Sequence, residues 1–146
     1  MKTLLPLLLV WCANACLASA NPDLAITPFT VGHQTFRAGD EIVIDQVLAT
    51  SSALKVGDQV VVHGHYRLTS APKASLGLMV THLDRVNISD PTEASQHAPA
   101  IQPGGAFTLS CRITYEGALH VSFYSVSTGQ SVGGVYFSPA PGSPHP

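Results

Sequence analysis

Alternation of apolar and polar residues with a period of two constrains the fold of this chain more than any other feature. In residues 59–68 one phase holds Val60, Val62, Gly64, Tyr66 and Leu68, and the other holds Gln59, Val61, His63, His65 and Arg67. Successive side chains of a β-strand point to opposite faces, so one face of this strand is predicted to be buried and the other to face water. No long segment shows the 3.6-residue period of a helix. The pattern therefore predicts an all-β fold.

Other short stretches indicate further strands between Gly-Asp, Pro-Gly and Gly-Gly breaks. They are Ala106–Tyr115, Leu119–Tyr124, Ile42–Leu48, Leu76–Thr81, Val132–Phe137 and, less regularly, Leu24–Phe29. The short connection at Glu116 and Gly117 predicts a hairpin between the strands on either side of it. The chain is therefore expected to form six or seven strands.

One-sided alternation requires a second layer over each apolar face, which favours a two-sheet antiparallel sandwich. Its general shape is expected to be immunoglobulin-like, and a small β-barrel is the alternative. The Cys, Trp, Cys arrangement of antibody domains is absent, because the only tryptophan is Trp11. Nothing about function follows from this general shape.

The first twenty residues have the pattern of a secretory signal peptide. Lys2 precedes an apolar run from Leu4 to Cys12, and Ala18-Ser19-Ala20 forms a small-residue cleavage site before Asn21. The run is shorter than the roughly 20 residues needed to span a membrane. We therefore expect a secreted or periplasmic protein without a membrane span, in which 1–20 is the signal peptide, 21–138 a single sandwich domain and 139–146 a proline-rich tail.

The composition of the remaining 126 residues excludes several classes of protein. Loss of Lys2 leaves six basic and nine acidic residues, a net charge of −3, which excludes a basic nucleic-acid-binding domain. Cys111 is the single cysteine left, so no internal disulfide can form. It falls in the apolar phase of its strand, where a thiol is expected to pack as a small hydrophobe. Stability must therefore come from burial.

Two turns and one loop stand out between the predicted strands. Gly39-Asp40 and Gly57-Asp58 each precede an apolar strand, and we interpret them as two turns of the same kind. Residues 85–105 form the longest predicted loop. This loop includes Asn87-Ile88-Ser89, an acceptor for N-glycosylation in a eukaryotic source, and Asp90 and Glu93, interpreted with Asp84 as solvated acidic residues.

The strongest candidate metal motif is His63-Gly64-His65. Two histidines at i and i+2 on one strand face lie roughly 6.5–7 Å apart at the backbone and can bind one metal ion. His120, also in the polar phase of its strand, is the candidate third ligand, and copper or zinc suits imidazole nitrogen. We favour the simpler interpretation that these are surface histidines on a polar sheet face that bind no metal.

Tyr124 and Tyr136 form the second candidate site. Both are expected in the outward phase of late strands, where tyrosines can stack on a sugar or pack against a protein, or simply pair across strands. No G-x-S-x-G, H-E-x-x-H, P-loop or G-x-G-x-x-G motif indicates catalysis. The sequence thus favours a secreted non-catalytic binding or structural module with a protein or carbohydrate partner. The alternatives are a copper- or zinc-binding protein and a small secreted hydrolase or lyase.

We expect the exported protein to begin at Asn21, because cleavage requires the small residues at Ala18 and Ala20. Intact mass spectrometry of the exported product measures this directly. A mass that retains residues 1–20 contradicts the signal-peptide interpretation.

Overall fold

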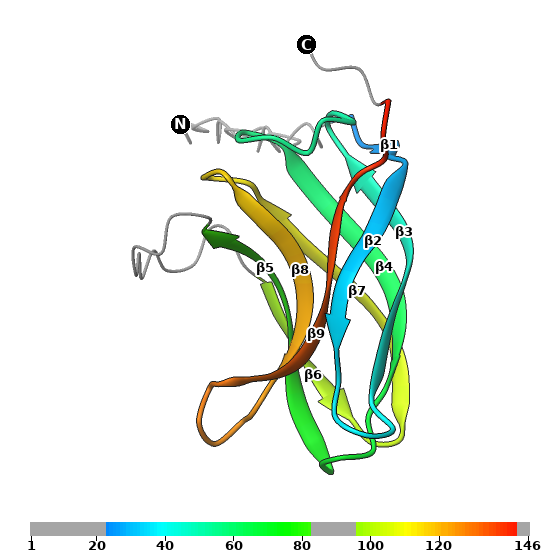
Figure 1. Ribbon diagram of the computed structural model, residues 1–146, viewed down its shortest axis with the longest axis vertical. Helices are drawn as coiled ribbons and strands as arrows, with labels where there is room; N and C mark the ends of the chain where they lie inside the picture. The colour runs from blue at the N-terminus through cyan, green and yellow to red at the C-terminus, as the bar shows by residue number, and fades with distance from the viewer. Residues whose placement is uncertain (1–22, 83–95, 143–146) are drawn as a thin grey trace, which may run out of the picture.

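The part of the chain that the structure describes forms nine antiparallel β-strands, shown in Figure 1. This computed structural model describes residues 23–82 and 96–142. The strands are β1 (Ala25–Ile26), β2 (Phe29–Thr35), β3 (Glu41–Ala49), β4 (Gln59–Arg67), β5 (Lys73–His82), β6 (Gln96–Ile101), β7 (Gly104–Arg112), β8 (Gly117–Tyr124) and β9 (Ser131–Pro139). Over these two ranges there is no helix long and apolar enough to cross a membrane.

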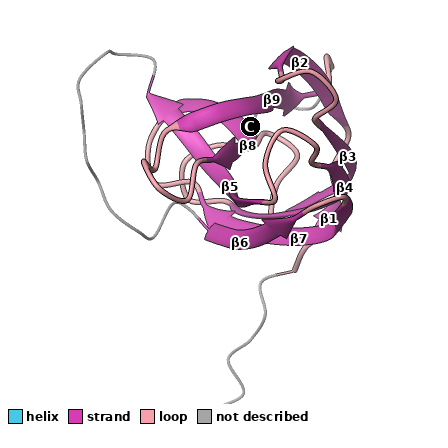
Figure 2. Ribbon diagram, turned by 90° about the horizontal axis from the view of Figure 1, so that it is seen from below, coloured by secondary structure: helices cyan, strands magenta, loops and turns pink. Residues whose placement is uncertain are grey.

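The strands form two sheets that face each other. The four-stranded sheet has the order β1-β3-β4-β7, and the five-stranded sheet has the order β2-β9-β8-β5-β6. Every pair is antiparallel. Figure 2 shows the two sheets end-on, with the strands arranged around a shared interior. The prediction of an all-β, two-sheet sandwich is confirmed, and the sheets do not close into a barrel.

The core lies between the two sheets and follows the predicted alternation. Its completely enclosed side chains include Val47, Val60, Val62 and Leu109 from the four-stranded sheet and Leu76, Leu78, Val121, Phe123 and Val135 from the five-stranded sheet. Tyr66 and Phe123 join the sheets through an edge-to-face contact with ring centroids 5.9 Å apart. Cys111 is buried as expected, and this burial raises the pKa of its thiol to about 12.

The number of strands was underestimated. β2 extends well past the weak stretch at Leu24–Phe29, and β6 lies within the predicted loop 85–105. Both are edge strands whose residues are nearly all exposed. A strand without a buried face leaves no apolar alternation in the sequence, so the pattern could not reveal either one. At the other end, β9 includes Pro139, which was assigned to the tail.

The predicted hairpin at Glu116 and Gly117 is wrong. β7 pairs with β4, whereas β8 pairs with β5 and β9, so the connection crosses from one sheet to the other. Ile113 remains bonded to the four-stranded side, donating its N–H to the Asp58 carbonyl at 2.9 Å. Alternation fixes which side of a strand is buried, but it does not distinguish a hairpin from a crossing between layers.

The two Gly-Asp turns are alike, as expected. Gly39 and Gly57 have φ of 88° and 98°, a region that glycine adopts without strain. Each following aspartate is buried and binds a neighbouring segment. Asp40 accepts bonds from the Thr69 and Ser70 N–H groups at 2.8 and 2.9 Å and from the Ser70 hydroxyl at 2.5 Å. The carboxylate thereby fixes the segment between β4 and β5.

Asp58 has the same role between β3 and β4. Its carboxylate accepts hydrogen bonds from the Ser51 and Thr50 hydroxyls at 2.6 and 3.0 Å and from the Lys55 N–H at 2.8 Å. Desolvation by burial acts to raise the pKa of this carboxyl, but the hydrogen bonds, together with the charge of Lys55, outweigh it and lower the pKa below 3.8.

Asp58→Ala is expected to cost about 2–4 kcal/mol, because it leaves three donors without their acceptor. A carboxyl whose pKa is lowered in the folded state stabilises the fold above its unfolded pKa and loses that contribution as pH falls. Urea unfolding between pH 5 and pH 2 should therefore show a smaller acid loss in Asp58→Asn than in the wild type. Glu116→Gln, at an exposed carboxyl, is the control, and an equal effect of both variants contradicts the role of Asp58.

Candidate functional site

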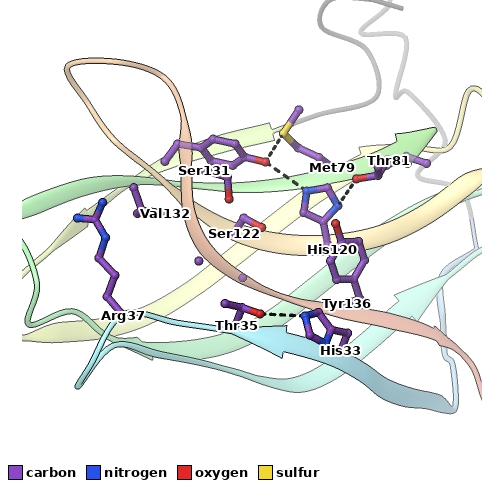
Figure 3. A pocket seen from close by; sticks show the side chains of 14 residues that line it. His33, Thr35, Arg37, Met79, Thr81, His120, Ser122, Ser131, Val132 and Tyr136 are labelled. Carbon is purple, nitrogen blue, oxygen red and sulfur yellow. Dashed lines mark hydrogen bonds between the residues drawn. The ribbon is translucent and has the colours of Figure 1, made fainter. Parts of the chain in front are cut away.

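The outer face of the five-stranded sheet contains a hollow of about 740 Å³, which we call the first hollow (Figure 3). It lies on the side of the sheet opposite the core. It is lined by His33, Thr35, Arg37, Met79, Val80, Thr81, His120, Ser122, Tyr124, Ser131, Val132, Gly133, Gly134 and Tyr136. A volume of this size falls in the usual range of ligand sites in proteins.

Burial of β8 on both faces gives the first hollow its floor. Leu119, Val121 and Phe123 face the core, as predicted. His120 and Ser122 have the outward phase, yet they are only 7% and 4% exposed. In Figure 1, β8 is curved along its length, and its concave side faces away from β3 and β4. An outward phase therefore does not place these two side chains in open solvent.

Gly134 contributes to the shape of the first hollow. It lies opposite Ser122 in the pairing of β8 with β9. A Cβ at this position would collide with the Ser122 hydroxyl and press on the Val121 carbonyl. The absence of a side chain at Gly134 leaves room for the Ser122 side chain, which lies against the Gly134 backbone.

His120 is the central polar group of the first hollow. Its Nδ1 lies 3.1 Å from the Thr81 hydroxyl, and its Nε2 lies 3.2 Å from the Tyr124 hydroxyl. Tyr124 donates to Met79 Sδ at 2.8 Å. With the proton on Nε2, His120 donates to the Tyr124 oxygen and accepts from Thr81, so one neutral tautomer accounts for all three contacts.

Burial controls the protonation of both groups. Desolvation lowers the pKa of His120, although the hydrogen bond that its protonated Nδ1 would donate to the Ala118 carbonyl opposes the shift. Burial also raises the pKa of Tyr124. At neutral pH the floor of the first hollow therefore holds a neutral imidazole next to a neutral phenol.

The two predicted tyrosines lie together in the first hollow. Tyr136 is opposite His120 in the pairing of β8 with β9, and their rings are in tilted contact with centroids 4.9 Å apart. Tyr124 contacts the His97 ring of β6 edge-to-face at 5.4 Å. Both tyrosines are half-buried. Each ring is thus held by neighbours and still lines the hollow.

The candidate metal residues do not come together. His63 and His65 lie in the four-stranded sheet, where their Nδ1 atoms lie 2.8 Å from the Thr108 hydroxyl and 3.0 Å from Asp45, whereas His120 lies in the five-stranded sheet. Within 23–82 and 96–142, no group of three or more His, Cys, Asp or Glu side chains could hold a metal ion. Binding of copper or zinc by the pair alone stays a prediction.

Sequence reasoning missed His33, Arg37 and Met79, which come from β2, the segment after it and β5. Only the order of strands in the sheet brings them to the two tyrosines. The signal-peptide residues 1–20, together with Asp84, Asn87, Asp90 and Glu93, lie outside the described residues. Comparisons with protein families, curated proteins and solved structures find no match for this chain.

His120→Gln tests the buried neutral imidazole. A base whose pKa is lowered in the folded state makes the fold lose stability as pH falls below its unfolded value, near 6.5. Wild-type stability should therefore decrease between pH 7.5 and pH 5, and His120→Gln should flatten this decrease. Urea unfolding at both pH values measures it, with His33→Gln, at an exposed histidine, as the control. A decrease that persists unchanged in His120→Gln contradicts the assignment.

Proposed function

We propose that this chain is a secreted, non-catalytic binding module that takes a carbohydrate in the first hollow. The observation that carries the proposal is the lining itself: two half-buried tyrosines beside serine and threonine hydroxyls in a hollow of ligand size. Sugars present both apolar C–H faces and hydroxyl groups. Tyr136 and Tyr124 supply ring surface for the first, and Ser122, Ser131 and Thr81 supply hydrogen-bonding groups for the second.

The concave shape favours a carbohydrate over a folded protein partner. A stable protein interface needs roughly 800 Å² of complementary surface on each side. A chain of sugar units is narrow enough to lie between β2 and β5, where the lining side chains are. The signal-peptide pattern of residues 1–20 is consistent with a role outside the cytoplasm.

A second candidate, an enzyme acting on the bound carbohydrate, is favoured by the buried neutral His120 next to Tyr124. A neutral imidazole in a hollow is a suitable general base. However, no carboxylate of the described residues lines the first hollow, and the usual glycoside hydrolases need two. Binding alone therefore remains the first proposal.

Calorimetric titration of the mature protein with a panel of neutral and acidic oligosaccharides tests the proposal. At least one is expected to bind, and Tyr136→Ala should weaken that binding about tenfold, corresponding to about 1.4 kcal/mol, by removing the stacking surface. Tyr124→Phe keeps the ring and loses only the hydroxyl, so it should weaken binding less. His63→Ala, on the other sheet, is the control. Binding that none of the variants changes contradicts a site in the first hollow.

Chain length of the oligosaccharide after incubation separates the two candidates. An unchanged length supports a binding module. Shortened products that disappear in His120→Gln support the enzyme, and the melting temperature of this variant shows whether it remains folded.

A further inference from the structure

Three hollows adjoin around the turn between β8 and β9. The second hollow, of about 350 Å³, shares Arg37 and Val132 with the first. The third, of about 390 Å³, shares Lys73, Ala74 and Val126 with the second. It extends to His97, whose ring contacts Tyr124 of the first hollow. The shared residues place the three hollows next to one another, and we call the three together the band.

The charges along this band are of one sign. Arg37 and Lys73 line it, and no aspartate or glutamate of the described residues does. The whole chain carries a net charge of −2, so the band is basic on an acidic protein. Fixed positive charge at a surface hollow attracts anionic ligands.

The described acidic residues are engaged or lie elsewhere. Asp40 and Asp58 are buried in hydrogen bonds, Glu41 pairs with Arg67 at 3.2 Å, and Asp45 pairs with His65 at 3.0 Å on the four-stranded sheet. Arg37 and Lys73, both exposed, form no ion pair with a carboxylate of the described residues. Both also line the second hollow. Two unpaired cations at one hollow can therefore contact successive anionic groups of one ligand.

We propose that the carbohydrate is an acidic polysaccharide, whose carboxylate or sulfate groups pair with Arg37 and Lys73 while its sugar rings lie against Tyr136 and Tyr124. This inference rests on the proposed function and adds the charge of the ligand to it. Carboxylate and sulfate share the chemistry that the two cations recognise. A nucleic acid fits less well, because its affinity grows with the number of phosphates that a protein neutralises, and Arg37 and Lys73 are the only arginine or lysine side chains of the described residues that line the band.

Titrations with three oligosaccharides of equal length test the inference: an oligogalacturonide, a sulfated oligosaccharide and a neutral oligosaccharide. An anionic member should bind at least tenfold more tightly than the neutral one, and its affinity should fall about tenfold between 50 and 500 mM NaCl. A preference between the two anionic members identifies carboxylate or sulfate as the recognised group.

Charge variants locate the site. Arg37→Gln with Lys73→Gln should reduce anionic binding at least tenfold and weaken neutral binding by a much smaller factor, because Arg37 also lines the first hollow. Arg112→Gln, an exposed cation on β7 of the other sheet, removes charge without touching the band and is the matched control.

The outcomes separate this inference from the proposed function. Equal affinity for neutral and anionic members, with no effect of Arg37→Gln and Lys73→Gln, overturns the acidic ligand and leaves the carbohydrate module standing. Absence of binding to all three overturns both. Equally tight, Arg37-dependent binding of a single-stranded oligonucleotide overturns the choice of a polysaccharide.

Discussion

Burial of β8 on both faces is the constraint on which the rest of this structure depends. On the core side, Val121 and Phe123 are completely enclosed and connect the five-stranded sheet to the four-stranded one. On the outer side, His120 and Ser122 are nearly as inaccessible. A strand in this position must satisfy its outward polar groups within the protein, because water does not reach them freely. The contacts of His120 with Thr81 and Tyr124 meet that requirement and also organise the first hollow.

The sequence predicts which face of a strand a residue occupies wherever apolar and polar residues alternate along that strand. Alternation placed Val60, Val62, Val121 and Phe123 in the core and Tyr124 and Tyr136 on the outer face, because the side of a strand depends only on counting by two. The contact of Tyr136 with His120 depends on the register of β8 against β9, which no single strand reveals. The burial of His120 could not be predicted from the sequence either, because it depends on the curvature of the sheet.

The two outer faces differ in how their charges are used. On the four-stranded sheet, Glu41 pairs with Arg67 and Asp45 with His65. These exposed pairs contribute little to stability, roughly 0–1 kcal/mol each. More important for the charge distribution, the Glu41 carboxylate lies next to Arg67 and the Asp45 carboxylate next to His65, both on the four-stranded sheet. Arg37 and Lys73, which line the band, form no ion pair with a carboxylate of residues 23–82 and 96–142.

A histidine at position 120 is not the choice that would make the fold most stable. An apolar residue would fill the space between Met79 and Tyr136 without desolvating a polar ring, and its burial would favour folding by about 1.5–3 kcal/mol. His120 instead requires two hydroxyl partners and loses stability when it is protonated. Departures from the most stable choice are concentrated at functional sites, where an interaction with a ligand offsets their cost. This departure lies in the floor of the first hollow, with Arg37 in the same lining, and it therefore supports the proposal that the outer face of the five-stranded sheet binds the ligand.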